Sequence, residues 1–211
     1  MRQRNIKNLE QKIEMNSSFL IRDPKDMKGR WNEVFGNDNP IYLEIGCGKG
    51  KFILDYADKN PQNNYIAIEG QENVALRALE KAEQGGISNL RIFMDYVQDL
   101  KDYFNEGELQ GIFLNFSDPW PKARHAKRRL THHKRLKNYK EVLKSDGTIE
   151  FKTDNDGLFD FSLEEIEEAE LQIIEKTTDL HASDYASKNI TTEYEDKFRA
   201  GGKNINYVKF R

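Results

Sequence analysis

An acidic residue, a rigid aromatic turn and a basic tract follow one another in the middle of the chain. Residues 116–122 have the sequence FSDPWPK and come directly after an apolar segment, 111–115, that is typical of a buried strand. From Lys122 to Lys140 the chain has nine Lys or Arg residues and no Asp or Glu. The acid, Asp118, could simply cap a turn, and the basic run could be a solvated helix face. Together they indicate chemistry carried out on a polyanion.

A glycine-rich turn follows the apolar segment 41–45. Residues 44–50 read EIGCGKG, and a helix is expected to start near Lys51. Glycines here let the backbone approach a ligand without interference from a Cβ atom, and in an open α/β sheet such a turn lies at the edge where ligands bind. Glu69 stands nineteen residues after Gly50, where an acid commonly holds ribose hydroxyls. A nicotinamide-dependent enzyme would also fit these features.

Two details of the turn favour a different cofactor. The spacing is G-x-G-x-G rather than G-x-G-x-x-G, and Glu44 precedes the first glycine. A diphosphate requires backbone N–H groups and no nearby carboxylate, whereas a ribose with a sulfonium and an ammonium group tolerates one. The turn resembles motif I of the Rossmann-like methyltransferases that use S-adenosylmethionine. That resemblance implies that Asp95, at the end of the third expected strand, faces the adenine.

Three further segments resemble, in order and spacing, the signatures of the bacterial tRNA (guanine-N7-)-methyltransferases. They are residues 118–130 (DPWPKARHAKRRL), residues 152–155 (KTDN) and residues 192–195 (TEYE), the last followed by Lys197-Phe198 and Gly201. The similarity covers essentially the whole chain. Arg135 departs from it, because the family more often has an apolar residue there, and this leaves the packing of the surrounding helix open.

The resemblance implies a cofactor pocket and a substrate surface. The pocket for S-adenosylmethionine, whose product is S-adenosylhomocysteine, would involve Glu44, Gly46, Gly48, Glu69, Asp95 and Asp118, with Asp118 also the catalytic residue. Substrate contacts would come from Lys122, Asp154, Thr192, Glu193, Tyr194 and Glu195, and contacts with the RNA backbone from Arg124, Lys127, Arg128 and Arg129. The implied substrate is a guanosine in the variable loop of tRNA, methylated at N7.

The residue inventory agrees with methylation at N7. Guanine N7 carries an in-plane lone pair, so its attack on a sulfonium methyl group needs no prior deprotonation. Alignment, excluded water and placed charge can supply the rate. Because the methylated purine is cationic, Asp118 could stabilise the developing charge, and Asp154 or Glu195 could accept hydrogen bonds from the guanine N1–H and N2–H₂ groups. No metal is expected, because His125, His132 and His133 lie among cationic residues without further ligands at a suitable spacing.

Two other functions compete with this one. An exocyclic-amine RNA methyltransferase also carries an acid or Asn followed by Pro and an aromatic residue at this strand end, although residues 117–120 (SDPW) lack its usual second proline. A non-catalytic tRNA-binding module that has kept the nucleotide fold is the second alternative. The intact glycine turn with Glu44 and Glu69 argues against it.

The elements that must position these residues alternate between strand and helix. Helices are expected over 72–84 and 134–144, the latter ending near Gly147, and the expected strands are 41–45, 65–68, 90–94, 111–116, 148–152, 171–175 and 205–210. The order predicts an α/β fold, Rossmann-like and doubly wound, with a mostly parallel seven-stranded sheet, an antiparallel edge strand and helices on both faces. Residues 31–211 would form a single methyltransferase domain. Residues 1–30 would be a polar N-terminal extension that could be mobile.

Composition sets the remaining limits. The 211 residues are 33% charged and 37% hydrophobic with a net charge of −3, which suits one globular domain rather than a disordered chain. The single cysteine, Cys47, excludes an internal disulfide framework and fits a reducing cytosol. Neither a secretory signal nor a membrane-spanning run is seen in the sequence, so a cytoplasmic protein with no membrane partner is expected. The expected partner is tRNA, and the chain could be a monomer or a homodimer.

Overall fold

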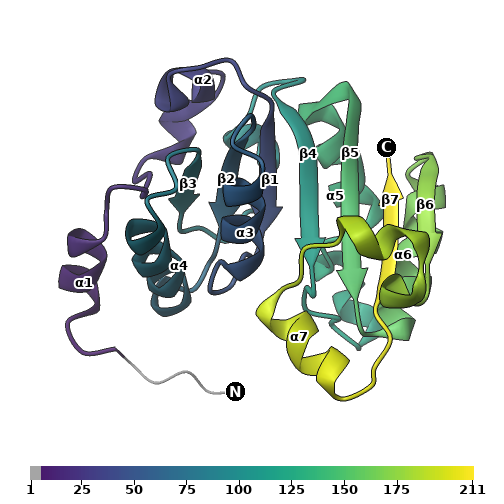
Figure 1. The fold of residues 1–211 in the computed structure, drawn as a ribbon. Helices are drawn as coiled ribbons and strands as arrows, with labels where there is room; N and C mark the ends of the chain where they lie inside the picture. The colour runs from purple at the N-terminus through teal and green to yellow at the C-terminus, as the bar shows by residue number, and fades with distance from the viewer. Residues whose placement is uncertain (1–5) are drawn as a thin grey trace.

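The computed structural model describes residues 6–211; residues 1–5, the start of the expected N-terminal extension, lie outside the described residues. Within 6–211, seven strands form one sheet in the order β3-β2-β1-β4-β5-β7-β6 (Figure 1). The strands are β1 (Ile41–Ile45), β2 (Asn64–Ile68), β3 (Leu90–Phe93), β4 (Leu109–Asn115), β5 (Leu143–Thr153), β6 (Ile173–Thr177) and β7 (Asn206–Phe210). The α-helices are α1 (Leu9–Met15), α2 (Trp31–Phe35), α3 (Lys51–Lys59), α4 (Glu72–Gly85), α5 (His133–Val142), α6 (Asp156–Glu168) and α7 (Glu193–Ala200).

The sheet confirms the predicted Rossmann-like, mostly parallel architecture. Strands β1 to β5 pair in parallel, and β7 is antiparallel to both of its neighbours, β5 and β6. The antiparallel strand therefore lies one position in from the edge, and β6 is the edge strand. Since the carboxyl ends of β1, β2, β4 and β5 meet at one side of the sheet, the turns that follow them are brought together there (Figure 1).

Alternation along the strands divides the core between the two faces of the sheet. Residues 41, 43 and 45 of β1 pack in the cluster that holds Trp31 of α2 and the buried sides of α5 and α6. Tyr42 faces the other way, into the cluster formed with α1, α3 and α4. Glu44 shares the parity of Tyr42, so a carboxylate is directed into the apolar layer beneath α3. The helices cover both faces, as predicted.

The described part of the N-terminal extension packs against the domain. Ile13 of α1 is buried in the cluster with α4. The backbone N–H of Ile21 donates to the carbonyl of Ile92 at 2.8 Å, and the N–H of Ile92 donates to the carbonyl of Phe19 at the same distance. Residues 19–21 thus extend the sheet beside β3, using a few apolar side chains in an otherwise polar segment.

The boundary between α5 and β5 differs most from the prediction. The helix expected over 134–144 ends at Val142, and β5 starts at Leu143 instead of near Thr148. Leu143 pairs with Leu109 before an irregularity in the register, and the regular pairing with β4 resumes at Thr148. β5 starts early because of this separate pairing of Leu143, and the sequence of residues 144–147 does not by itself indicate a strand. Across residues 6–211, none of the helices combines the length and the apolar character needed to cross a membrane.

Candidate functional site

The turn after β1 requires its glycines. Gly46, Gly48 and Gly50 have φ values of +79°, +59° and +82°, the left-handed region that other residues rarely adopt. A Cβ on Gly50 would lie 2.8 Å from the Cβ of Ala78, so the close approach of the turn to α4 also depends on it. The N–H of Gly48 donates to the Glu69 carboxylate at 3.0 Å. This bond fastens the turn after β1 to the turn after β2.

A cavity of about 510 Å³ opens beside this turn, at the carboxyl ends of the parallel strands. Its size is that of a typical small-molecule site. Four of the residues expected to bind the cofactor line it: Gly46, Glu69, Asp95 and Asp118. The structure therefore brings together acids from the ends of β2, β3 and β4 that are up to 49 positions apart in the sequence.

Glu44, which the sequence resemblance implied as a cofactor-binding residue, does not line this cavity. The side chain is 2% exposed and accepts a hydrogen bond from the Asn115 amide at 2.7 Å, while Asn115 itself lines the cavity. Its other carboxylate oxygen finds no hydrogen-bond partner within residues 6–211. Burial raises the pKa of Glu44 to about 7, although the bond from Asn115 and the charge of Lys152 oppose this.

Backbone and side-chain donors orient the two acids at the ends of β2 and β3. Burial raises the pKa of Glu69, and the N–H groups of Gln71 and Gly48 partly offset that effect. Asp95 accepts a hydrogen bond from the Tyr103 hydroxyl at 2.6 Å. Because the Tyr103 ring packs in the core, its hydroxyl fixes the position of the Asp95 carboxylate.

Asp118 is presented by a strained loop. Phe116 and Trp120, on either side of it, have φ values of +50° and +40°, which cost on the order of 1–3 kcal/mol each for residues other than glycine. The N–H of Phe116 donates to the carbonyl of Lys152 at 2.9 Å, which fixes the start of the loop to β5. Asp118 is exposed at the mouth of the cavity.

The basic tract after this loop divides into two groups. Four of the residues expected to contact substrate or RNA are exposed: Lys122, Arg124, Lys127 and Arg128. The guanidinium of Arg128 lies 4.8 Å from the centre of the Trp120 ring. Arg129 is different, because it is half-buried and donates to the carbonyls of Pro119 and Trp120 at 2.9 and 3.1 Å. The expectation that Arg129 meets the RNA backbone stays a prediction, but two of its guanidinium donors already bond to the loop.

The segment 192–195 forms the start of α7. The Thr192 hydroxyl accepts from the N–H of Glu195 at 2.9 Å, and the Glu195 carboxylate accepts from the N–H of Thr192. These two reciprocal bonds form a capping box. Glu195 is 0% exposed and accepts from Lys152 at 2.9 Å and from Asn189 at 2.6 Å. The Glu195 carboxylate, expected from the resemblance to contact substrate, is therefore already bonded within the protein. Glu193 forms an ion pair with Lys81 of α4 at 2.6 Å.

Tyr194, the neighbour of Glu195 in α7, is 48% exposed. Its ring centre lies 5.4 Å from that of Phe116, on the strained loop. Desolvation raises the pKa of Tyr194, and the negative charges of Asp154 and Asp118 raise it further. The packing of Tyr194 on Phe116 places the start of α7 beside the loop that carries Asp118.

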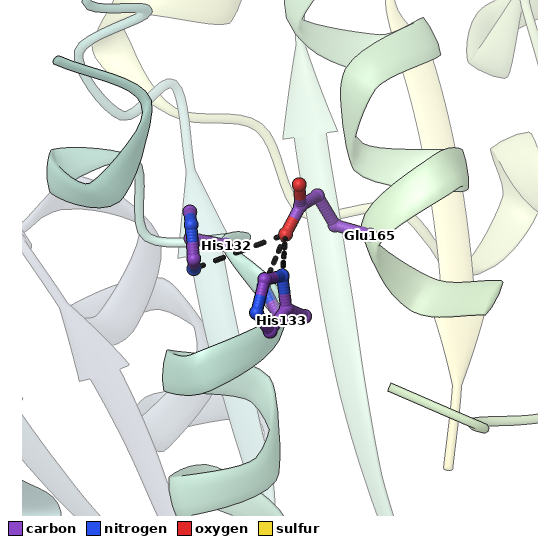
Figure 2. A group of neighbouring side chains, drawn as sticks. All are labelled: His132, His133 and Glu165. Carbon is purple, nitrogen blue, oxygen red and sulfur yellow. Dashed lines mark hydrogen bonds and ion pairs between the residues drawn. The ribbon is translucent and has the colours of Figure 1, made fainter. Parts of the chain in front are cut away.

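A group of potential metal ligands is assembled away from the cavity. Figure 2 shows His132 and His133 at the start of α5 with Glu165 of α6, whose potential ligand atoms all lie within 4.8 Å of one another. Glu165 is thus a further potential ligand that the spacing of these histidines in the sequence does not reveal. Glu165, however, accepts two hydrogen bonds from His133, one from Nδ1 at 2.7 Å and one from the backbone N–H. The distance between Nδ1 and the carboxylate oxygen is shorter than the separation of two ligand atoms on one metal ion. We interpret the group as a hydrogen-bonded tie between α5 and α6.

Two polar residues of the cavity wall that the sequence did not single out as site residues are Asn115 and Arg135. Asn115, the last residue of β4, connects the cavity to Glu44. Arg135 donates to the carbonyl of Val97 at 3.2 Å and also lines the cavity. The departure of Arg135 from the family pattern could have indicated this role, because a charged side chain on the inner side of a helix requires a polar partner.

A glycine turn after β1, acids at the ends of β2 and β3, and a cavity at that edge of a 3-2-1-4-5-7-6 sheet define the Rossmann-like methyltransferases as the class of this chain. A family model described as "Putative methyltransferase" matches residues 38–208. The chain is 46% identical over 211 residues to a tRNA (guanine-N(7)-)-methyltransferase of Streptococcus agalactiae, with both chains fully covered. It is 48% identical to the protein of the same name from Lachnoclostridium phytofermentans, covering 100% of this chain and 99% of the relative. The chain belongs to the tRNA (guanine-N(7)-)-methyltransferase family.

Solved structures support the fold. An antibiotic-related methyltransferase aligns with a TM-score of 0.65 at 17% identity, covering 88% of this chain and 92% of that one. The 16S rRNA methyltransferase KamB aligns with a TM-score of 0.64 at 11% identity, covering 86% and 91%. At these identities the likeness concerns the arrangement of the elements and not the substrate.

Proposed function

We propose that this enzyme transfers a methyl group from S-adenosylmethionine to N7 of a guanosine in the variable loop of tRNA. The observation that carries the proposal is the position of Asp118. It stands at the mouth of the cavity beside Glu69 and Asp95, and the exposed basic residues begin four positions later at Lys122. Membership of the tRNA (guanine-N(7)-)-methyltransferase family supports it.

The residues around the cavity fit S-adenosylmethionine. Glu69 and Asp95 offer carboxylates for ribose hydroxyls and for an adenine amino group, and the open space above Gly46, where a Cβ would meet nothing within 4 Å, leaves room for a ligand. The carboxylates also suit the positive charges of a sulfonium and an ammonium group. When bound, S-adenosylmethionine supplies the electrophilic methyl group.

The chain's own residues align the base and stabilise its charge. Guanine N7 needs no general base, so Asp118 would act as a carboxylate placed next to the purine ring as it becomes cationic. Asp154 would accept from the guanine N1–H and N2–H₂ groups. We assign that role to Asp154 and not to Glu195, because the Glu195 carboxylate is bonded to Lys152 and Asn189.

Exposed residues around the loop would bind the tRNA. Lys122, Arg124, Lys127 and Arg128 present cations for phosphate groups, which position the RNA without reading its sequence. Thr192 and the exposed Tyr194 would contact the target nucleotide from the other side, where stacking of an aromatic ring on an unpaired base is common. Glu193 would orient this side through its ion pair with Lys81. A cytoplasmic location and a monomeric or dimeric state remain predictions.

The decisive experiment is methylation of unmodified tRNA. The chain is incubated with tRNA transcripts and labelled S-adenosylmethionine, and the digested nucleosides are identified by mass spectrometry. We expect 7-methylguanosine at one position in the variable loop. An N2- or N6-methylated nucleoside would instead support the exocyclic-amine alternative, and binding of S-adenosylmethionine without any product would support a non-catalytic module.

A further inference from the structure

Arg129 holds the loop that carries Asp118. Its Nε donates to the carbonyl of Pro119 at 2.9 Å, and its Nη2 donates to the carbonyl of Trp120 at 3.1 Å. The Cζ atom of the same guanidinium lies over the Phe161 ring of α6, 4.1 Å from the ring centre. One side chain therefore connects the two residues that follow Asp118 to a helix of the core.

The loop requires such a restraint. Phe116 and Trp120 both have positive φ values, so the backbone on each side of Asp118 is in a conformation that a free chain would leave. Residues in such conformations persist only where the surrounding structure determines them. The start of the loop is fixed by the bond from Phe116 to the carbonyl of Lys152. Arg129 supplies the corresponding restraint at the end of the loop.

We propose that Arg129 is a positioning residue for methyl transfer, which acts by fixing the backbone of Pro119 and Trp120 and thereby the carboxylate of Asp118. It does so through the geometry of its guanidinium and not through its charge. The expected effect on the rate of methyl transfer rests on the proposed function, but the restraint on the loop can be measured independently of that function.

The neighbouring arginine provides the contrast. Arg128 is exposed and covers the face of the Trp120 ring, so its donors remain accessible to phosphate. Arg129 is half-buried, and two of its donors, Nε and Nη2, bond to carbonyl oxygens of its own chain. A lysine cannot replace it, because an ammonium group lacks the planar fork that reaches two carbonyls and stacks on an aromatic ring.

The test compares Arg129→Ala and Arg129→Lys with the wild-type enzyme and with Arg77→Ala. Arg77 is an exposed residue of α4 that pairs with Glu80, so its variant controls for the loss of one arginine. Three quantities are measured: the single-turnover rate with saturating tRNA and S-adenosylmethionine, the dependence of tRNA affinity on salt, and the quenching of tryptophan fluorescence by acrylamide. Because Trp31 is 0% exposed, quenching reports mainly on Trp120.

We expect Arg129→Ala to lower the single-turnover rate at least about 10-fold and to increase quenching, with the salt dependence of tRNA binding unchanged. Arg129→Lys should show the same defects despite its positive charge. Ethylguanidinium should restore part of the rate of Arg129→Ala, and ethylammonium at the same ionic strength should not. Arg77→Ala should match the wild type.

Three results would overturn the proposal. They are a wild-type rate in Arg129→Ala, quenching in Arg129→Ala equal to that of the wild type, and full activity in Arg129→Lys together with a shallower salt dependence in Arg129→Ala. The last would show that the charge meets RNA. If Arg129→Ala does not fold, Arg129→Lys decides by its rate and quenching. A wild-type enzyme that makes no 7-methylguanosine would contradict the proposed function, and quenching would still test the restraint.

Discussion

The ammonium group of Lys152 lies 2.9 Å from the carboxylate of Glu195, and both side chains are almost completely buried. Lys152 ends the regular pairing of β5 with β4, and Glu195 lies in the first turn of α7. Burial lowers the pKa of Lys152, and the negative charge of Glu195 opposes that effect. The pair therefore fixes the segment with Thr192 and Tyr194 to the sheet, next to the loop of Asp118.

Removal of the lysine should destabilise the protein strongly. Lys152→Met leaves the Glu195 carboxylate buried without its cation, which costs about 3–5 kcal/mol in free energy of unfolding. Urea denaturation followed by circular dichroism measures this. Lys101→Met removes one partner of an exposed pair with Glu141 and should cost less than about 1 kcal/mol. Equal effects of the two substitutions would contradict the stabilising role of the buried pair.

Asp118→Asn should separate catalysis from binding. The amide is nearly isosteric but cannot stabilise the cationic purine, so the single-turnover rate should fall about 100-fold or more. Affinity for tRNA should change less than about threefold, because the exposed basic residues remain. Asp160→Asn, at an exposed position of α6, serves as the control and should leave the rate unchanged. A rate for Asp118→Asn close to that of the wild type would show that Asp118 is not catalytic.

The four exposed basic residues should act through phosphates. Lys127→Ala or Arg124→Ala removes one cation, so in each variant the negative slope of log affinity against log salt should become shallower by about 0.7–0.9. Filter binding of tRNA between low and moderate salt measures the slope. Lys59→Ala, at the exposed end of α3, should leave it unchanged. Parallel salt curves for all the variants would mean that this tract does not contact the RNA backbone.

The sequence predicted the sheet and the place of the site because both depend on local patterns. Apolar segments of strand length give β1 to β5, and the glycine turn and Asp118 must lie at the carboxyl ends of parallel strands once those strands align. Glu69 and Asp95 also follow strands directly, so their meeting with Asp118 at one cavity could be foreseen. The parallel alignment of the strands and the place where each strand ends are sufficient to predict that these acids lie at one edge of the sheet.

What the sequence could not reveal is which polar groups already have partners. Arg128 and Arg129 are identical in type and adjacent, yet one is exposed and the other bonds to Pro119 and Trp120. Glu195 matched a substrate-binding signature, but its partner Lys152 is 43 positions away. Such pairings depend on the packing of distant segments, which residue type and spacing do not encode.

The stability of the cofactor-free protein should depend on pH through Glu44. Its pKa is about 7 in the folded protein against 4.5 for the free side chain, because its carboxylate is buried beneath α3. Between these values the folded protein holds a proton that the unfolded chain has released, so the free energy of unfolding falls as pH rises through this window. Glu44→Gln removes the titrating group. The free energy of unfolding of the variant, relative to the wild type, should therefore increase by about 2–3 kcal/mol between pH 5 and pH 8, as measured by urea denaturation at each pH. Parallel pH curves for the two proteins would mean that Glu44 is ionised throughout this range in the folded state, in which case a donor other than Asn115 must stabilise its charge.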